Sequence, residues 1–325
     1  MAGLFRLWHE KHNLPADPKH ISFHGKAVLI TGATSGLGFE ASIKFVQQGV
    51  SSLIIGSRDQ ERGKKAKERL EQLTGRSVVQ VWPLDMSSFH SVVEFASRVD
   101  RNMPKLDVAI LNAGVMHREY TLSQDGWEDT LQVNTLSTAL LALLLLPKLE
   151  QSLPVPRSST SASGEASTPH LVIVSSGTAV RIAEKDLPPS TSRAPLLSYL
   201  NQSSQTNGPS ARKRYAITKL LIEYVARHIA KELAQNTTST ATATGGNLNV
   251  IVNTVKPGLC VSSLGREYTN NNSRWYERWA LGLFNKLFAR PTEAGSRVLV
   301  GASVQGYESH GRMWKGDRYL EYVIA

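Results

Sequence analysis

The chain has 325 residues, of which 41% are hydrophobic and 20% are charged, and its formal net charge is +10. These values are typical of a soluble globular protein, and the length favours one large domain over two. A single cysteine, Cys260, excludes a disulfide within the chain and a cysteine-based metal cluster, and it fits a reducing compartment. We therefore expect no metal site and a cytoplasmic location.

Two apolar stretches do not have the properties of membrane-targeting segments. Residues 1–13 contain Leu4, Phe5 and Trp8, but charged residues interrupt them, so no signal peptide is predicted. Residues 140–146 are rich in leucine but too few to span a bilayer, and they predict a buried helix. No stable membrane span is therefore expected.

Positive charge clusters in residues 58–69, RDQERGKKAKER. A solvated helix face explains this run best, and a field that attracts the phosphates of an anionic cofactor is the next alternative. Nucleic-acid binding ranks third, because no aromatic-rich surface or known binding module accompanies the charge. We therefore expect no nucleic-acid partner.

Residues 26–38, KAVLITGATSGLG, predict a strand, a glycine-rich turn and a helix in succession. Glycines let the backbone bend sharply and approach a ligand, and the amides at a helix start favour an anion. This order of elements predicts a dinucleotide site. Its spacing, TGxxxGxG, resembles that of the short-chain dehydrogenase/reductase family. The resemblance implies cofactor contacts from six residues of the turn: Gly32, Thr34, Ser35, Gly36, Leu37 and Gly38.

The second predicted strand, residues 53–55, is followed by Ser57 and Arg58. In dinucleotide folds the end of this strand faces the adenosine ribose, where an acidic side chain would repel a 2′-phosphate. A guanidinium binds phosphate strongly, so Ser57 and Arg58 predict NADP(H) over NAD(H). Asp59 is expected to start the next helix.

The third and fourth predicted strands, residues 78–84 and 106–111, end in further cofactor candidates: Asp85 and Met86 after the third, and Asn112, Ala113 and Gly114 after the fourth. The resemblance implies that Asp85 contacts adenine, although this carboxylate can equally cap the helix that follows. The second group resembles the family's NNAG motif, with Leu111 in place of its first asparagine.

Residues 127–149 predict a long apolar helix that contains Asn134. An amide in such a stretch is costly unless it is hydrogen-bonded. The resemblance places Asn134 at the family's catalytic asparagine, which holds a water in a proton relay. A purely structural asparagine is the alternative.

The fifth predicted strand, residues 170–176, ends in two serines, and Tyr215 and Lys219 form a Tyr-x-x-x-Lys motif on a later helix. Residues four apart share one helix face, so the phenol and the ammonium can converge on one site. The resemblance implies that Ser176 orients the substrate oxygen, Tyr215 exchanges its proton and Lys219 binds the nicotinamide ribose. A free tyrosine titrates at about pH 10, and a nearby lysine and an oxidised nicotinamide would both favour its phenolate.

Two low-complexity stretches, residues 154–169 and 236–246, predict exposed loops inserted within the domain. The long gap between Ser176 and Tyr215 resembles an extra substrate-side loop of retinol-dehydrogenase-like members and their fungal relatives.

The sixth predicted strand, residues 249–255, leads to Pro257 and Gly258, which resemble the family's turn beside the nicotinamide. Ser262 or Ser263 is expected to replace the threonine that usually contacts the carboxamide in this family. Cys260 lies close by and is expected to be an inert thiol.

Residues 275–288, WYERWALGLFNKLF, predict an amphipathic helix with one apolar face. Three interpretations are open: packing in the core, closure over the substrate as a lid, and contact with a membrane surface. We prefer the lid, because the flanking residues 270–272 and 290–291 suit hinges. It is expected to occupy about residues 259–290.

Together these patterns predict an α/β fold, a Rossmann-type doubly wound parallel sheet with helices on both faces. A single domain covers residues 21–325 after an N-terminal extension of residues 1–20, and six strands are legible against the family's seven. The resemblance implies an NADP(H)-dependent oxidoreductase that interconverts a carbonyl and an alcohol on a small apolar molecule, with secondary metabolism as a candidate setting and a homodimer as a candidate assembly. Two alternatives are an enzyme of this fold recruited for cyclisation or isomerisation and a non-catalytic binding protein.

Overall fold

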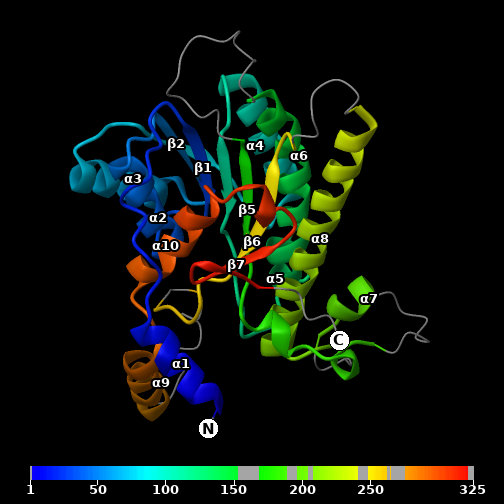
Figure 1. Cartoon of the computed structure of the whole chain (residues 1–325). Helices are drawn as coiled ribbons and strands as arrows, with labels where there is room; N and C mark the ends of the chain where they lie inside the picture. The colour runs from blue at the N-terminus through cyan, green and yellow to red at the C-terminus, as the bar shows by residue number, and fades with distance from the viewer. Residues whose placement is uncertain are drawn as a thin grey trace.

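A computed structural model describes residues 2–152, 168–188, 196–203, 208–240, 248–261, 264 and 275–320 (Figure 1). Its centre is one eight-stranded sheet with the strand order β3-β2-β1-β4-β5-β6-β7-β8. The strands are β1 Ala27–Thr31, β2 Ser52–Ser57, β3 Val79–Pro83, β4 Val108–Leu111, β5 His170–Val174, β6 Ile251–Val255, β7 Met313–Lys315 and β8 Arg318–Leu320. All neighbouring pairs are parallel except β7 and β8.

Helices cover both faces of this sheet, as the sequence predicts for a doubly wound fold (Figure 1). On one face lie α2 Gly36–Gln47, α3 Gln60–Thr74 and α10 Thr292–Ala302. On the other lie α4 Phe89–Asn102, α6 Ser137–Gln151 and α8 Ala211–Thr240. The strand order reverses between β1 and β4, and in such sheets ligands bind at the carboxyl ends of the strands next to that reversal.

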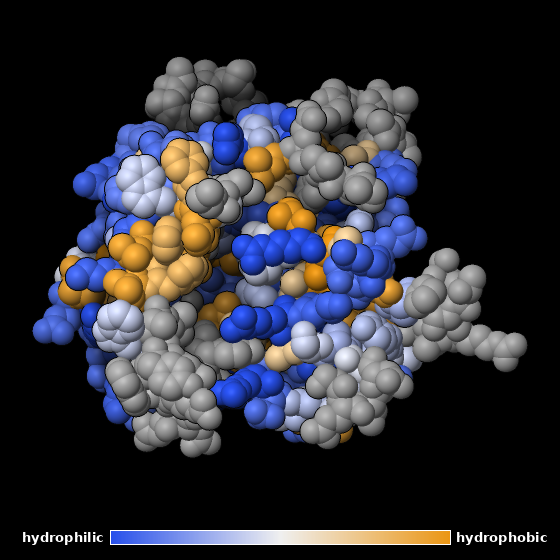
Figure 2. Space-filling model, turned by 90° about the horizontal axis from the view of Figure 1, so that it is seen from below, coloured by the Kyte–Doolittle hydropathy of each residue, from blue (hydrophilic) through white to orange (hydrophobic). Residues whose placement is uncertain are grey.

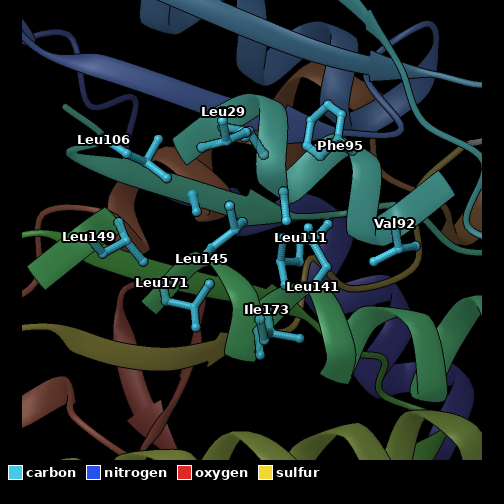
Figure 3. Close-up of a cluster of buried hydrophobic side chains, with 14 of the residues drawn as sticks. Leu29, Val92, Phe95, Leu106, Leu111, Leu141, Leu145, Leu149, Leu171 and Ile173 are labelled. Atoms are coloured by element: carbon cyan, nitrogen blue, oxygen red, sulfur yellow. The ribbon is translucent and has the colours of Figure 1, made fainter. Parts of the chain in front are cut away.

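Alternating side chains of each strand enter two separate hydrophobic clusters, one on each face. Leu29 packs toward α4 and α6, whereas Val28 and Ile30 pack toward α2 and α10. Successive strand residues point to opposite faces, so a strand buried on both sides must be apolar throughout. Figure 3 shows the first cluster, in which leucines four residues apart on α6 meet the side chains of β4 and β5.

The six strands expected from the sequence are confirmed with small shifts of their ends, and two more are present. β7 and β8 contain three residues each and form a hairpin around Asp317, which has a φ of 62°. Three residues are too few to produce a recognisable alternation, so the sequence gives no signal for them.

The predicted helix over residues 127–149 is interrupted near its start. It consists of α5 Asp129–Leu131, a π-helical turn Gln132–Leu136, and α6. Single π-helical turns are frequent at functional sites, and this one contains Asn134. Within the described residues, Asp129–Gln151 is the one stretch long and apolar enough to cross a membrane, but most of it is buried in the fold. Core helices of soluble proteins pass the same test, so it is weak evidence for a membrane span.

Two helices lie at one end of the molecule, at the lower left of Figure 1: α1 Ala2–His12 and α9 Trp275–Phe288. They contact each other although they lie far apart in the sequence. A short helix, α7 Leu196–Leu200, precedes α8 and buries Leu200 against Leu131 and Ile217 in a small third cluster.

The loop predicted over residues 236–246 is partly wrong, because α8 continues to Thr240. The low-complexity threonines conceal this extension, since they give the helix no apolar period. Most of the other low-complexity stretch, its residues 154–167, lies outside the described residues.

Candidate active site

A cavity of about 580 Å³ opens at the carboxyl ends of the strands. Nearly all of the predicted site residues line it: Gly32, Thr34, Ser35, Gly36, Leu37, Ser57, Arg58, Asp85, Met86, Asn112, Ala113, Gly114, Ser176, Tyr215, Lys219, Pro257 and Gly258. Gly38 and Asn134 are the two predicted site residues that do not line the cavity. Residues far apart in the sequence therefore converge on one hollow, as expected when parallel strands end at one edge.

The glycine-rich turn fits closely against the loop after β4. Gly32 has a φ of 65°, and a Cβ added there would lie 2.9 Å from the Cα of Ala113. A Cβ on Gly38 would lie 2.6 Å from the carbonyl oxygen of Gly32. Side chains at these positions would therefore push the turn away from its neighbours. The backbone forms a cradle from which α2 departs at Gly36, and a helix start of this kind suits a dinucleotide pyrophosphate.

Asn112 and Thr31 hold this cradle in place. The Nδ2 of Asn112 donates to the carbonyl oxygens of Thr31 at 3.0 Å and Gly32 at 3.1 Å. In the opposite direction, the Thr31 hydroxyl accepts from the backbone N–H groups of Asn112 at 3.0 Å and Ala113 at 2.9 Å. Thr31 carries no mark in the sequence, because a threonine at a strand end is common and its partners are determined only by the fold.

The end of β2 has the features expected for recognition of a phosphate. The Ser57 hydroxyl donates to the carbonyl oxygen of Asp59 at 2.6 Å. Asp59 itself caps α3, where its carboxylate accepts from the backbone N–H of Arg62 at 3.0 Å, as predicted. The side chains of Arg58 and Arg62 are exposed and both line the cavity. The sequence does not distinguish Arg62 from the other charges of residues 58–69, most of which belong to a solvated helix face.

Asp85 lines the cavity and is hydrogen-bonded within its own turn, and it does not cap the helix that follows. Its carboxylate accepts from the backbone N–H of Ser87 at 3.0 Å and from the Ser87 hydroxyl at 2.7 Å. Ser88, and not Asp85, occupies the cap position of α4. Asp85 therefore shapes the loop beside the adenine end of the predicted cofactor site.

Asn134 joins the π-helical turn to the loop after β4. Its Oδ1 accepts from the backbone N–H of Val115 at 2.9 Å, and its Nδ2 donates to the Val115 carbonyl oxygen at 2.9 Å and to the Thr218 hydroxyl at 3.2 Å. A Cβ on Gly114 would lie 3.1 Å from Oδ1 of Asn134 and 3.4 Å from Nζ of Lys219. The buried amide is thus fully hydrogen-bonded, which meets the structural requirement for burying it.

Tyr215 and Ser176 form the polar centre of the cavity. Tyr215 is 6% exposed; burial raises its pKa to about 12, and a hydrogen bond with Ser176 lowers it. The Ser176 hydroxyl also accepts from the hydroxyl of Thr178 at 3.0 Å. Burial is the larger of these two effects, so the pKa of Tyr215 lies above its ordinary value, whereas a nearby lysine and an oxidised nicotinamide were expected to lower it. The tyrosine is a neutral phenol at physiological pH and can donate a proton.

Lys219 lies one helical turn beyond Tyr215 and is part of a buried charged cluster. Its Nζ donates to the carbonyl oxygen of Val174 at 2.9 Å. Burial lowers the pKa of Lys219 to about 8, and the carboxylate of Glu223, one turn further along α8, raises it.

Glu223 links three segments beneath the cavity. It accepts a hydrogen bond from the Ser175 hydroxyl, and Nζ of Lys256 lies 3.4 Å from its Oε1. Burial raises the pKa of Glu223, while Lys256, Ser175 and Lys219 all lower it. The carboxylate thus connects α8 to the residues next to Ser176 and Pro257. Glu223 is not recognisable in the sequence, because a glutamate four residues after a lysine usually forms a surface pair with it.

His117 and Asp129 form a second polar pair in the cavity wall that the sequence analysis did not identify. Their Nε2 and Oδ2 atoms are 2.7 Å apart. Cys260 also lines the cavity, and burial raises the pKa of this thiol to about 11, which fits the expected inert role. The candidates for the carboxamide contact, Ser262 and Ser263, lie outside the described residues.

The arrangement suits a dinucleotide and a small substrate. Among the described residues, no group of three or more His, Cys, Asp or Glu side chains could hold a metal ion. The cavity instead combines a glycine cradle, two arginines at one end and a neutral phenol with a lysine at the other. This combination can bind an anionic dinucleotide and exchange a proton with a bound oxygen.

Comparisons with known proteins agree with this geometry. A sequence model described as "short chain dehydrogenase" matches residues 26–164. The chain is 40% identical over 314 residues to the short-chain dehydrogenase/reductase phmF of Phaeosphaeria nodorum, covering 96% of this chain and 83% of that one. It is also 40% identical over 319 residues to the short-chain dehydrogenase/reductase ffsI of Aspergillus flavipes, covering 98% and 84%.

Solved structures show the same fold at lower sequence identity. A short-chain dehydrogenase from Shigella flexneri superposes with a TM-score of 0.60 at 19% identity, covering 94% of this chain and 95% of the other. One from Escherichia coli in complex with NADPH superposes with a TM-score of 0.56 at 19% identity, covering 91% and 98%.

Proposed function

The chain belongs to the short-chain dehydrogenase/reductase family, and from this premise we propose that it is an NADP(H)-dependent oxidoreductase that interconverts a carbonyl and an alcohol on a small apolar molecule. The observation that carries the proposal is the joint placement of Ser176, Tyr215 and Lys219 on the wall of the cavity that also contains the glycine cradle. A binding protein without turnover would not need a buried phenol and ammonium at that point.

The chain's own residues would act on the substrate oxygen. Bound NADP(H) would supply or accept the hydride. Ser176 would donate a hydrogen bond to the carbonyl oxygen and orient it. Tyr215, which is a neutral phenol because burial raises its pKa to about 12, would give its proton to that oxygen during reduction. Lys219 would bind the nicotinamide ribose, and Asn134 would hold the backbone of the loop after β4 in position.

The choice of NADP(H) rests on the end of β2. No acidic side chain follows Ser57 directly, and Arg58 and Arg62 line the cavity there. Guanidinium groups form strong charge-assisted hydrogen bonds with phosphate, so the pair would favour a 2′-phosphate. Among proteins of the same fold, the Escherichia coli structure in complex with NADPH is consistent with this choice.

The substrate class rests on the apolar side chains of the cavity wall. Four of them are Met116, Val133, Leu259 and Leu264. Leu259 and Leu264 belong to the segment 259–290, which we propose to close over the substrate. Apolar ketones and aldehydes, as made in secondary metabolism, fit such a wall.

The test is consumption of NADPH by the purified protein with a panel of apolar polycyclic ketones and long aldehydes, combined with product analysis. Tyr215→Phe should lower turnover by about two orders of magnitude or more, because it removes the proton donor and keeps the ring. NADPH binding should persist. Tyr224→Phe is the matched control, since Tyr224 lies on the same helix and is exposed. Substrate conversion without NADPH consumption would instead indicate an isomerisation or cyclisation.

A further inference from the structure

The helices α1 and α9 present an unusual apolar surface. Six large apolar side chains of α1 and α9 are each more than 40% exposed: Leu4, Phe5, Trp8, Trp279, Leu283 and Leu287. Together they form what we call the docking face. Figure 2 views the molecule from below and shows apolar side chains gathered on its left side. This is the end of the molecule where α1 and α9 lie in Figure 1. Contiguous exposed patches of this kind mark interaction sites.

The docking face arises because α9 turns one apolar stripe outward. Trp279, Leu283 and Leu287 are spaced four residues apart, so they follow one side of the helix, and Trp279 is 66% exposed. Phe284 and Phe288 are less exposed, and their ring centroids are 5.0 Å apart. On α1, the rings of Phe5 and Trp8 are stacked with centroids 6.3 Å apart. An amphipathic helix normally buries such a stripe against its own core.

The charges beside the docking face are cationic among the described side chains. Lys286 is exposed in the last turn of α9, and Lys11 lies beside it and donates to the Lys286 carbonyl oxygen. The acidic residue of α1, Glu10, is neutralised by Lys315, whose Nζ lies 2.5 Å from its Oε1. Exposed aromatic and leucine side chains flanked by lysines are the composition of helices that lie in the surface of a bilayer. Tryptophan in particular favours that interface.

We propose that the docking face binds the surface of an anionic lipid bilayer. A net charge of +10 attracts the whole molecule to such a surface, and Lys11 and Lys286 would contact the headgroups while the aromatic side chains enter the acyl boundary. A second copy of this chain would bring the same lysines against them, and like charges across an interface are repulsive. The bilayer is therefore the occupant whose charge complements the face.

The docking face is joined to the mouth of the cavity through Arg290. Its Nε donates to the carbonyl oxygen of Glu10 on α1 at 2.8 Å. Its backbone N–H donates to the carbonyl oxygen of Leu259 at 2.8 Å, and Leu259 lines the cavity. Arg290 also follows α9 by two residues. A bilayer bound to α1 and α9 would thus lie next to the segment that borders the substrate end of the site.

The experiment is sedimentation of the full chain with phosphatidylcholine vesicles prepared with and without phosphatidylserine. The wild type should sediment with the anionic vesicles, and less so at high salt, because salt screens the lysines. The double variant Phe5→Glu/Trp279→Glu should bind those vesicles about tenfold more weakly or worse, since both rings lose their apolar contacts. The matched control is Leu73→Glu/Leu143→Glu, which alters two leucines of similar exposure on α3 and α6.

Each outcome decides the proposal, and none depends on enzymatic activity. NADPH binding and the melting temperature of every variant verify folding. The proposal is overturned if the wild type sediments with neither vesicle, or if the Phe5/Trp279 variant binds as well as the control. A wild-type dimer that the same variant dissociates, without vesicle binding, would assign the docking face to a second copy of the chain.

Discussion

At the scale of single residues, burial moves the pKa values of the two central groups in opposite directions. It raises the pKa of Tyr215 to about 12 and lowers that of Lys219 to about 8. Both shifts favour neutral forms, since a charge loses its hydration in the interior. The phenol thereby remains a proton donor, while the ammonium depends on the nearby carboxylate of Glu223 to stay charged near neutrality.

Glu223→Gln tests that dependence through the pH profile. The Glu223 carboxylate raises the pKa of Lys219, so removing its charge should lower that pKa further. In the wild type, kcat/KM for reduction should fall as pH rises through about 8, because Lys219 loses its proton. In Glu223→Gln the same fall should begin at lower pH. Steady-state kinetics across pH would measure it, and an alkaline limb at the same pH in both proteins would contradict the role assigned to Glu223.

Arg58→Ala tests the cofactor choice. Only NADPH carries the 2′-phosphate, so its Kd should rise by about tenfold or more while that of NADH changes little. Ser57→Asp should shift the preference in the same direction by repulsion. Lys64→Ala is the control, because Lys64 is an exposed cation on α3, the helix that follows Arg58, but it does not line the cavity. Equal losses of affinity for both cofactors would show that Arg58 supports the fold and not the selection of the phosphate.

The site residues differ in how visible they are in the sequence. Tyr215 and Lys219 are marked by their spacing, and Arg58 by its place directly after a strand. Arg62 and Glu223 carry no such mark, because each belongs to a pattern that surface helices share. Their significance depends on which neighbours the fold places opposite them, such as Lys256 next to Glu223.

At the scale of elements, the position of α9 decides between the interpretations of its aromatic residues. Permanent core packing does not describe Trp279, which is 66% exposed. Trp279→Ala should therefore change the melting temperature little. Trp314→Ala is the buried comparison: Trp314 is 8% exposed and meets Tyr319 edge to face, so its loss should cost about 3–5 kcal/mol. Thermal melts of both variants would measure this, and a large loss for Trp279→Ala would contradict the exposed arrangement.

The lid over residues 259–290 stays a prediction, and Trp279→Ala can test it as well. If the segment closes over substrates, Trp279→Ala should raise KM for bulky substrates in solution without vesicles. An unchanged KM, with binding to anionic vesicles lost, would assign the ring to the docking face alone.

Long elements with a clear apolar pattern could be predicted from the sequence, whereas the short strands and the π-helical turn could not. The six longer strands and the helix containing Tyr215 follow from apolar runs and from helical spacing. The π-helical turn at Asn134 shifts the helix period by a single residue over five positions, which the surrounding leucines conceal. β7 and β8 are too short for an alternation to emerge.

At the scale of the whole molecule, the strand order places the cavity at the carboxyl ends of β1 and β4, the neighbouring strands between which the order reverses. Such a crevice follows from the doubly wound topology and was predictable once the first strand, turn and helix were recognised. The contact of α1 with α9 was not, because no local pattern relates segments about 270 residues apart in this sequence. The same contact creates the docking face beside the substrate end.

The central claim, that the chain transfers a hydride between NADP(H) and a carbon–oxygen bond, is tested most directly with NADPH deuterated at the transferable position of the nicotinamide. Product from an accepted ketone or aldehyde should carry one deuterium on the alcohol carbon, with one NADP⁺ formed for each product molecule. Mass spectrometry of the product and absorbance of the cofactor give both values. Conversion of the substrate without deuterium in the product and without loss of NADPH would contradict the account.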